Sequence, residues 1–384
     1  MQLCKLHISK LSATLLLVLS IISFKVYAGN SINAYYGHYS LNGKRAGFVA
    51  PSLGETIFEP WRSIKPIRPY KIAVLLPHLE DGFWLAVNRA IIERAKVLGV
   101  RVKFFSAGGY TQTSTQLQQL NPSFIDSEFD GIIVAPTSYA KLDNAISDLA
   151  KNQIPAVSLI NDIAAEDISG KVTMSYYDVG YKLGMFIAKD IKSNVANIVF
   201  LPGPADASWA AHTEQGFFKA IADNSNEQNL EQIKLVAKEY ADATYHKQHA
   251  LLEYILSKKQ NIDYVICNPS AALAAPEILT RFAKLHPNIK VVSTYMIPEL
   301  YPLLKSNLLY AAASAEVKLQ SEIALDMLVR ICNGENYKIE GSTMPFRISP
   351  QPMIYSAKEL ALYPYESLFG PISKNPILEY NMNM

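Results

Sequence analysis

The chain has 384 residues, of which 49% are hydrophobic and 18% are charged, and its formal net charge is +2. No block of like charge occurs, so we expect neither nucleic acid nor an anionic membrane surface as a partner. The length exceeds what one hydrophobic core usually organises and is sufficient for two lobes.

The first 28 residues have the pattern of a secretory signal peptide. Lys5 and Lys10 precede an apolar stretch at 11–24, and cleavage is expected after Ala28. A retained membrane anchor is the alternative, but the stretch is short for a membrane span and contains serine and threonine. Removing the lysines at 5, 10 and 25 changes the formal net charge from +2 to −1. No later segment has the length and apolarity of a span, so the mature protein is not expected to be embedded in a membrane.

Residues 29–69 differ in composition from the rest of the chain. They are rich in tyrosine, glycine and proline, and they end in a stiff segment between two prolines at 66–69. This composition predicts an extended N-terminal arm rather than a domain.

From residue 70 onward, apolar runs alternate with amphipathic stretches. This alternation predicts parallel sheets with helices on both faces, and two successive sheets predict an α/β protein of two Rossmann-like lobes with a cleft between them. The expected strands are 71–76, 100–106, 131–135, 156–160, 197–201, 233–240, 264–268, 291–295 and 308–312. The expected helices are 84–98, 113–120, 140–151, 178–192, 211–223, 245–258, 272–285 and 316–332.

The first of these strand–helix units carries the most informative motif, YKIAVLLPHLEDGFW at 70–84. The apolar strand ends at Pro77, and after a polar loop Phe83 and Trp84 open the helix. Ligands of parallel α/β folds bind at the carboxyl ends of the strands. Two large rings at this position are suited to holding a small ligand by its faces.

Further aromatic side chains follow other strands or lie where the chain would cross between lobes. Tyr110, Tyr176 and Tyr295 therefore join Phe83 and Trp84 in an expected aromatic set, although some of these rings could instead fill the core. Ring faces attract methylated ammonium groups by roughly 0.5–2 kcal/mol per ring. Four polar residues lie near the same positions and are further candidates: Asp81, Asn161, Asp178 and Asn268.

Signals for catalysis, metals and cofactors are weak. The sequence has no G-x-S-x-G elbow, H-E-x-x-H motif or P-loop, and His246 and His249 have no third ligand nearby. We therefore expect a binding protein rather than an enzyme, with no cofactor. Cys267 and Cys332 remain after cleavage; secretion permits a disulfide between them, but two thiols are the preferred interpretation.

The two-lobed plan resembles the type I periplasmic binding proteins. Sugar binders of that class generally have an Asp-Arg pair after the fourth strand and an aspartate after a late strand of the second lobe. This chain has Asn161-Asp162 and Tyr295 at those positions, so the sugar clamp is missing.

A closer resemblance is to the TorT family, whose members bind trimethylamine N-oxide in the periplasm and act with the sensor histidine kinase TorS. The matching stretches, in order, are LLPHLEDGFW at 75–84, AGGY at 107–110, FLPGP at 200–204, VVSTY at 291–295 and AAS at 312–314. The resemblance implies a periplasmic protein, an aromatic cage of Phe83, Trp84, Tyr110, Tyr176 and Tyr295 with Asp81 beside it, and a kinase partner.

The chain departs from the family pattern at two cage positions. The family commonly has tyrosine where this chain has Phe83, and tryptophan near the crossing where it has Tyr176. Asp178 adds an acid close to that crossing. These changes keep a cage but could shift the preference towards another methylated amine, such as a betaine or trimethylamine.

The resemblance also implies a hinge of three crossings, expected at 176–177, 313–314 and 335–337. Lobe 1 would then contain 70–176 and 313–336, and lobe 2 would contain 177–312 and 337–384.

The alternative function is a substrate-binding subunit of an importer for a sugar or another small solute.

Overall fold

The computed structural model describes residues 34–37, 61, 64–125, 128–191, 195–205, 207–228, 233–338, 343–372 and 374–381. The expected signal peptide at 1–28 and most of the expected arm lie outside these residues. Among the described residues, no helix is both long and apolar enough to cross a membrane.

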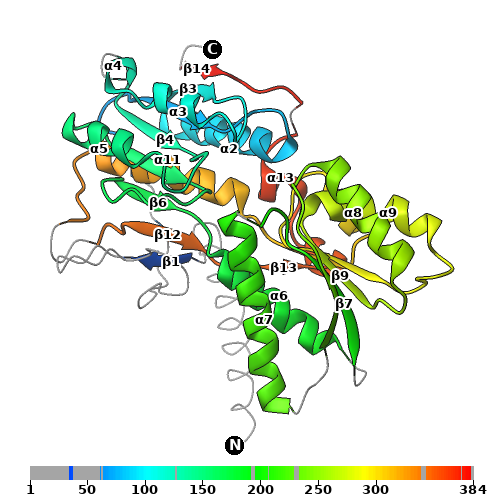
Figure 1. Cartoon of the computed structure of the whole chain (residues 1–384). Helices are drawn as coiled ribbons and strands as arrows, with labels where there is room; N and C mark the ends of the chain where they lie inside the picture. The colour runs from blue at the N-terminus through cyan, green and yellow to red at the C-terminus, as the bar shows by residue number, and fades with distance from the viewer. Residues whose placement is uncertain are drawn as a thin grey trace, which may run out of the picture.

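The described chain forms two sheets, each covered by helices (Figure 1). The first sheet and its helices form lobe 1, with strand order β1-β12-β6-β5-β4-β2-β3-β14. Its six inner strands from β12 to β3 form five parallel pairs, and the edge strands pair antiparallel, β1 with β12 and β14 with β3. The strands are β1 (Ala34–Gly37), β2 (Lys71–Leu76), β3 (Arg101–Ser106), β4 (Gly131–Val134), β5 (Ala156–Leu159), β6 (Gly170–Val172), β12 (Arg347–Pro350) and β14 (Glu379–Tyr380). The helices are α2 (Gly82–Leu98), α3 (Thr113–Gln119), α4 (Pro122–Ile125), α5 (Asp143–Lys151), α11 (Val317–Cys332) and α13 (Tyr365–Phe369).

The second sheet and its helices form lobe 2, with strand order β13-β11-β10-β9-β7-β8. All its pairs are parallel except β13 with β11. The strands are β7 (Ala196–Leu201), β8 (Ile233–Lys238), β9 (Tyr264–Cys267), β10 (Lys290–Ser293), β11 (Ala311–Ala313) and β13 (Ile354–Tyr355). The helices are α6 (Tyr176–Asp190), α7 (Ser208–Gln228), α8 (Tyr245–Lys258), α9 (Pro269–Arg281), α10 (Leu300–Lys305) and α12 (Ala357–Leu360).

The unit β2–α2 shows why the sequence folds as it does. All residues of β2 after Lys71 are buried, as expected for a central parallel strand covered on both faces. Asp81 caps α2 by accepting a hydrogen bond from the backbone N–H of Trp84 at 2.9 Å. Gly99 ends the helix with φ +69°, in the left-handed conformation that glycine adopts most easily.

The chain crosses between the lobes at 173–175, from β6 to α6, and at 314–316, from β11 to α11. These two crossings lie beside the expected positions. The expected crossing at 335–337 is wrong, because the chain after α11 stays in lobe 1 until β12, which pairs with β6. The third crossing is at 351–353, between β12 and β13.

The C-terminal residues do not all belong to lobe 2 either. After α12, which packs on α10, the chain returns to lobe 1, where α13 packs on α2 and α11. β14 then pairs antiparallel with β3, so that the described chain ends on the edge of the first sheet (Figure 1). The expected assignment of 337–384 to lobe 2 therefore holds only for its middle part.

The described parts of the expected arm lie on lobe 1. β1 pairs with β12, and the Trp61 indole N–H donates to Asp326 on α11 at 3.1 Å. Both cysteines are free, Cys267 in β9 of lobe 2 and Cys332 at the end of α11 in lobe 1, in agreement with the interpretation as two thiols.

Candidate functional site

The loop after β2 brings aromatic and acidic side chains to the carboxyl edge of the lobe 1 sheet. Pro77 follows the strand, and the loop carries His78 and Asp81 before α2 begins at Gly82. Because Asp81 is the N-cap, it fixes the start of α2 and with it the directions of Phe83 and Trp84. The rings of these two residues meet edge to face at 5.3 Å between centroids and 81° between planes.

The rings continue from lobe 1 into lobe 2. Phe83 packs edge to face on Tyr295, which follows β10, at 6.3 Å and 77°. Tyr295 in turn packs on Trp209 of α7 at 5.6 Å and 83°. Phe83 and Tyr295 therefore form a direct contact between the two lobes.

The rings also continue within lobe 1, from Trp84 through His78 to Tyr110. The centroid distances are 6.2 Å from Trp84 to His78 and 6.0 Å from His78 to Tyr110, both at 73° between planes. The Asn161 side-chain amide donates to the Tyr110 hydroxyl oxygen at 3.0 Å. Tyr110 as a whole remains 47% exposed although its hydroxyl end is buried, so the wall is open along the side of this ring. We call the chain of rings Trp209–Tyr295–Phe83–Trp84–His78–Tyr110 the aromatic wall.

The tyrosines of the site are kept neutral. Burial raises the pKa of Tyr176 to about 12. Burial also raises the pKa of Tyr110 and Tyr295, and for both hydroxyls the nearby Tyr176 and Asp81 add to the increase. Because Tyr176 and Asp81 both affect the pKa of Tyr110 and of Tyr295, these four residues lie close to one another. The hydroxyls therefore stay protonated at neutral pH and can act as hydrogen-bond donors.

Asn161 is held beside Tyr110 by an unusual backbone. Ile160, which precedes it, has φ +65°, and a β-branched residue rarely adopts this left-handed conformation. Strain of this kind persists where the surrounding structure holds it, and it is often found at functional sites. The Asn161 amide also donates to the carbonyl oxygen of Pro136 at 3.0 Å, so the side chain is fixed by two partners.

Two members of the aromatic wall, His78 and Trp209, were not among the expected site residues. His78 had a signal in the sequence, because it directly follows the strand and the proline that ends it. Trp209 had a weaker signal, its position shortly after the LPGP turn. Gly203 of that turn has φ +120°, and a Cβ built there would lie 2.6 Å from the Trp209 ring, so only glycine lets the ring lie this close.

Of two further expected polar candidates, one caps a helix and the other lies in a first helical turn. Asn268 is fully buried and caps α9: its oxygen accepts from the N–H groups of Ser270 and Ala271, and its amide donates to the Leu201 carbonyl oxygen. The structure thus uses its polar atoms for folding. Asp178 lies in the first turn of α6, where burial raises its pKa and Lys182 and Arg347 counteract the increase.

Asp162, the residue after Asn161, is occupied by two cations. Its carboxylate lies 2.9 Å from Lys171 Nζ and 3.3 Å from an Arg347 nitrogen, and both cationic side chains are only 2% exposed. The Asp162 carboxylate itself is 22% exposed, and its pairing with two buried cations makes it a structural group with little capacity left for a ligand.

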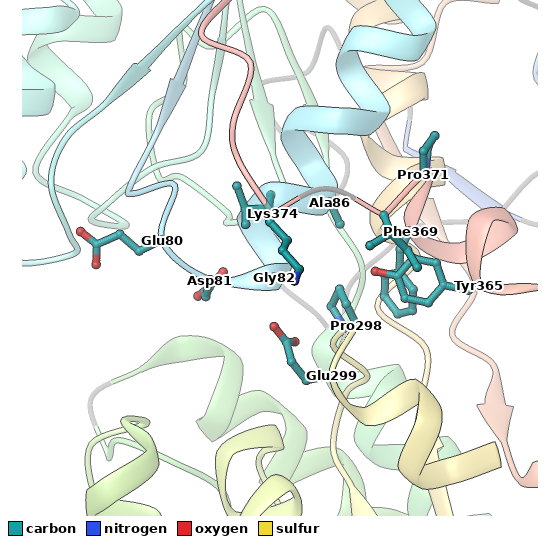
Figure 2. A pocket seen from close by; sticks show the side chains of 12 residues that line it. Glu80, Asp81, Gly82, Ala86, Pro298, Glu299, Tyr365, Phe369, Pro371 and Lys374 are labelled. Carbon is teal, nitrogen blue, oxygen red and sulfur yellow. The ribbon is translucent and has the colours of Figure 1, made fainter. Parts of the chain in front are cut away.

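A cavity of about 390 Å³ lies at one end of the contact between the lobes (Figure 2). Asp81 and Gly82 of lobe 1 and Pro298 and Glu299 of lobe 2 line it, together with C-terminal residues that include Tyr365, Phe369 and Lys374. Asp81 therefore belongs both to this cavity and to the neighbourhood of the aromatic wall. Among the described residues, no group of three or more His, Cys, Asp and Glu side chains could hold a metal ion.

The site is suited to binding a small ligand with an apolar cationic part. Ring faces from both lobes supply weak negative potential, and hydroxyls, an amide and an imidazole supply polar contacts. Electrostatic interactions of this kind are stronger where contact between the lobes lowers the exposure of the rings to water.

The chain is similar to several known periplasmic proteins. The chain is 26% identical to the periplasmic protein TorT of Escherichia coli K12 over 77% of this chain and 80% of TorT. It is also 26% identical to the D-allose-binding periplasmic protein of the same organism, over 63% of this chain and 78% of that protein.

Two solved structures are similar throughout. One is an ABC transporter solute-binding protein from Bradyrhizobium sp. BTAi1 with bound bis-tris, with a TM-score of 0.76, 26% identity and coverage of 91% of this chain and 98% of that chain. The other is the complex of the TorS sensor domain with TorT in the presence of trimethylamine N-oxide, with a TM-score of 0.69, 25% identity and coverage of 80% and 99%.

The sequence profile described as "Periplasmic binding protein domain" matches residues 72–336, which is more than half of the chain. The family is one of binding proteins. Together with its two helix-covered sheets and three crossings, this match establishes that the chain belongs to the family of periplasmic binding proteins and has their type I fold.

Proposed function

We propose that the protein captures trimethylamine N-oxide, or a related methylated amine, between its lobes in the periplasm. The cage would consist of Phe83, Trp84, Tyr110, Tyr176 and Tyr295, with Asp81 beside it. The observation that carries the proposal is the contact between Phe83 and Tyr295, which joins the rings of the two lobes edge to face. The nitrogen of an N-oxide or a betaine has four substituents and no N–H to donate, so ring faces are natural partners for its methyl groups.

We further propose that ligand binding is reported to the periplasmic domain of a membrane-bound sensor histidine kinase controlling N-oxide respiration. Support comes from the similarity to TorT, which forms a complex with the TorS sensor domain. A ligand that prefers the closed arrangement shifts the population towards it and changes the surface that a partner contacts.

A substrate-binding subunit of an importer is the second candidate. It is favoured by the equal identity to the D-allose-binding protein and by the similarity to a solute-binding protein of an ABC transporter. Against a sugar ligand, Asp162 is held by Lys171 and Arg347, and Tyr295 stands after the late strand β10. Sugar hydroxyls would lack the carboxylate and arginine partners that such binders use.

The deciding experiment is isothermal titration calorimetry of residues 29–384 with trimethylamine N-oxide, glycine betaine, trimethylamine, D-allose and ribose. Saturable binding of the N-oxide or the betaine, without heat from either sugar, would support the cage. Binding heat from D-allose or ribose alone would instead support the function as a substrate-binding subunit of an importer. Absence of binding heat with all five ligands would contradict both ligand assignments.

A further inference from the structure

His78 stands in the middle of the aromatic wall, yet it is the only member of the wall that can carry a charge at neutral pH. Its ring lies between those of Trp84 and Tyr110, with centroids 6.2 and 6.0 Å away. Only 17% of its side chain is exposed. If this position served packing alone, a phenyl ring would fill it better than an imidazole. The polar atoms of His78 therefore require an explanation.

The two nitrogens of the His78 ring have different surroundings. Nε2 lies 3.6 Å from Asp81 Oδ2, too far for a hydrogen bond but close enough for attraction once the ring is protonated. Nδ1 is buried and has no hydrogen-bond partner among the described residues. A buried polar atom without a partner is costly and is a sign of a missing ligand or water.

We propose that His78 binds the oxygen atom of the ligand and takes up a proton when the ligand binds. This inference rests on the proposed function, because it concerns the same site and a methylated amine that carries an oxygen. In the neutral tautomer that carries its proton on Nε2, Nδ1 has only a lone pair, which would repel an N-oxide or carboxylate oxygen placed beside it. The protonated ring presents an N–H at Nδ1, which donates to that oxygen.

Three groups from different parts of lobe 1 face the imidazole. Asp81 comes from the same loop, and its carboxylate balances the positive charge of the ring. Tyr110 comes from the loop after β3, and burial raises the pKa of its hydroxyl, so it stays neutral throughout the range in which histidine titrates. Trp84, from α2, does not titrate.

The proposal gives a selectivity rule for the site. An N-oxide or a betaine can place its methyl groups on the ring faces and its oxygen on His78. Trimethylamine is a cation without an oxygen at neutral pH, so a protonated His78 repels it. The affinities of the two kinds of ligand should therefore change with pH in opposite directions.

The test is calorimetry of the mature chain, residues 29–384, with trimethylamine N-oxide and with trimethylamine between about pH 5.5 and about pH 8.5. We expect the N-oxide affinity to fall about tenfold as the pH rises through the range in which histidine titrates. The trimethylamine affinity should rise over the same range. Titrations in two buffers of different ionisation enthalpy should show uptake of part of one proton with the N-oxide.

Two variants separate His78 from its neighbour. His78→Phe keeps a ring in the wall and should bind the N-oxide at least threefold more weakly at low pH, with no dependence on pH and no proton uptake. Asp81→Asn should weaken binding but keep the pH dependence, shifted to lower pH. The inference would be wrong if N-oxide binding by the wild type were independent of pH, or if His78→Phe kept the pH dependence of the wild type. Either result would leave the proposed aromatic cage unaffected. Absence of any N-oxide or betaine binding would instead refute the proposed function.

Discussion

The carboxylate of Glu299 in lobe 2 lies directly against Gly82, the first residue of α2 in lobe 1. A Cβ built on Gly82 would stand 2.1 Å from Glu299 Oε1 and 2.7 Å from its Cδ (Figure 2). The first turn of α2 contains no acidic residue of its own. Besides the Asp81 cap, Glu299 therefore adds, from the other lobe, a second negative charge of the kind that the N-terminus of a helix favours.

This contact exists only while the lobes are together, so weakening it should favour the open arrangement. We predict that Glu299→Gln and Gly82→Ala each lower ligand affinity about two- to fivefold, equivalent to roughly 0.3–1 kcal/mol for a charge at a helix N-terminus. The glutamate side chain is flexible and can turn away from a new methyl group, which keeps the effect of Gly82→Ala moderate. Calorimetry gives the affinities.

The double variant is the control for that prediction. If both changes act through the one contact, Gly82→Ala should add little once Glu299→Gln is present. Small-angle scattering of the ligand-free protein should show a larger mean radius for all three variants. Losses that simply add in the double variant would show that the two residues act separately.

The two tryptophans of the aromatic wall should respond differently to truncation. Trp84 is 2% exposed, and Trp84→Ala should lower the free energy of unfolding by about 3–5 kcal/mol, so its effect on binding is mixed with loss of stability. Trp209 is only half-buried, and Trp209→Ala should lower affinity about fivefold or more while leaving the lobe folded. Calorimetry combined with urea unfolding separates the two effects.

Trp209→Phe is the matched control, because it keeps a ring against Tyr295. It should retain most of the affinity. An unchanged affinity in Trp209→Ala would place Trp209 outside the binding site and limit the functional part of the wall to Tyr295 and lobe 1.

The main features of the fold were predictable because long apolar strands and amphipathic helices alternate along the chain. β2, for example, occupies the expected residues 71–76. The short strands were missed: β6 has three residues, and β12 is a four-residue segment ending in proline, too short to show a pattern. Missing β12 displaced the third crossing, because without it nothing marked the return of the chain to lobe 1.

The candidate site was predictable where a ring follows a strand. Phe83, Tyr110 and Tyr295 came from this rule, and the structure brings them into one wall with Trp84. Trp209 was missed because its contact with Tyr295 depends on the turn geometry at Gly203. The rule also selected Asn268, since a helix cap and a ligand contact both place a polar residue just after a strand.

Whether a polar residue just after a strand caps a helix or contacts the ligand can be tested with two asparagines. Asn268→Ala removes the cap of α9 and should lower the free energy of unfolding by about 1–2 kcal/mol without changing the affinity of the folded protein. Asn161→Ala removes the donor to the Tyr110 hydroxyl and should lower affinity about two- to fivefold. Unfolding curves and calorimetry on both variants give the four values, and a large affinity loss in Asn268→Ala would return that residue to the site.

The second crossing contains a carboxyl group in an unfavourable environment. Glu316 has φ +44° and directly precedes α11. Burial raises the pKa of its carboxyl, and hydrogen bonds from Ser314 and Tyr355 oppose the increase only in part. Since its pKa is higher in the folded than in the unfolded chain, the folded state binds the proton more tightly. The resulting stabilisation is present below the unfolded pKa of about 4.5 and is lost as the pH rises through the folded pKa.

Glu316→Gln, which keeps the shape but cannot ionise, should therefore unfold at a higher urea concentration than wild type at pH 7. The difference should shrink as the pH falls towards about 4, where Glu316 itself becomes neutral. Glu366→Gln, at an exposed position of α13, is the control and should show no such trend. If both variants gave the same dependence on pH, the destabilisation would belong to the general charge of the protein rather than to the carboxyl group at the hinge.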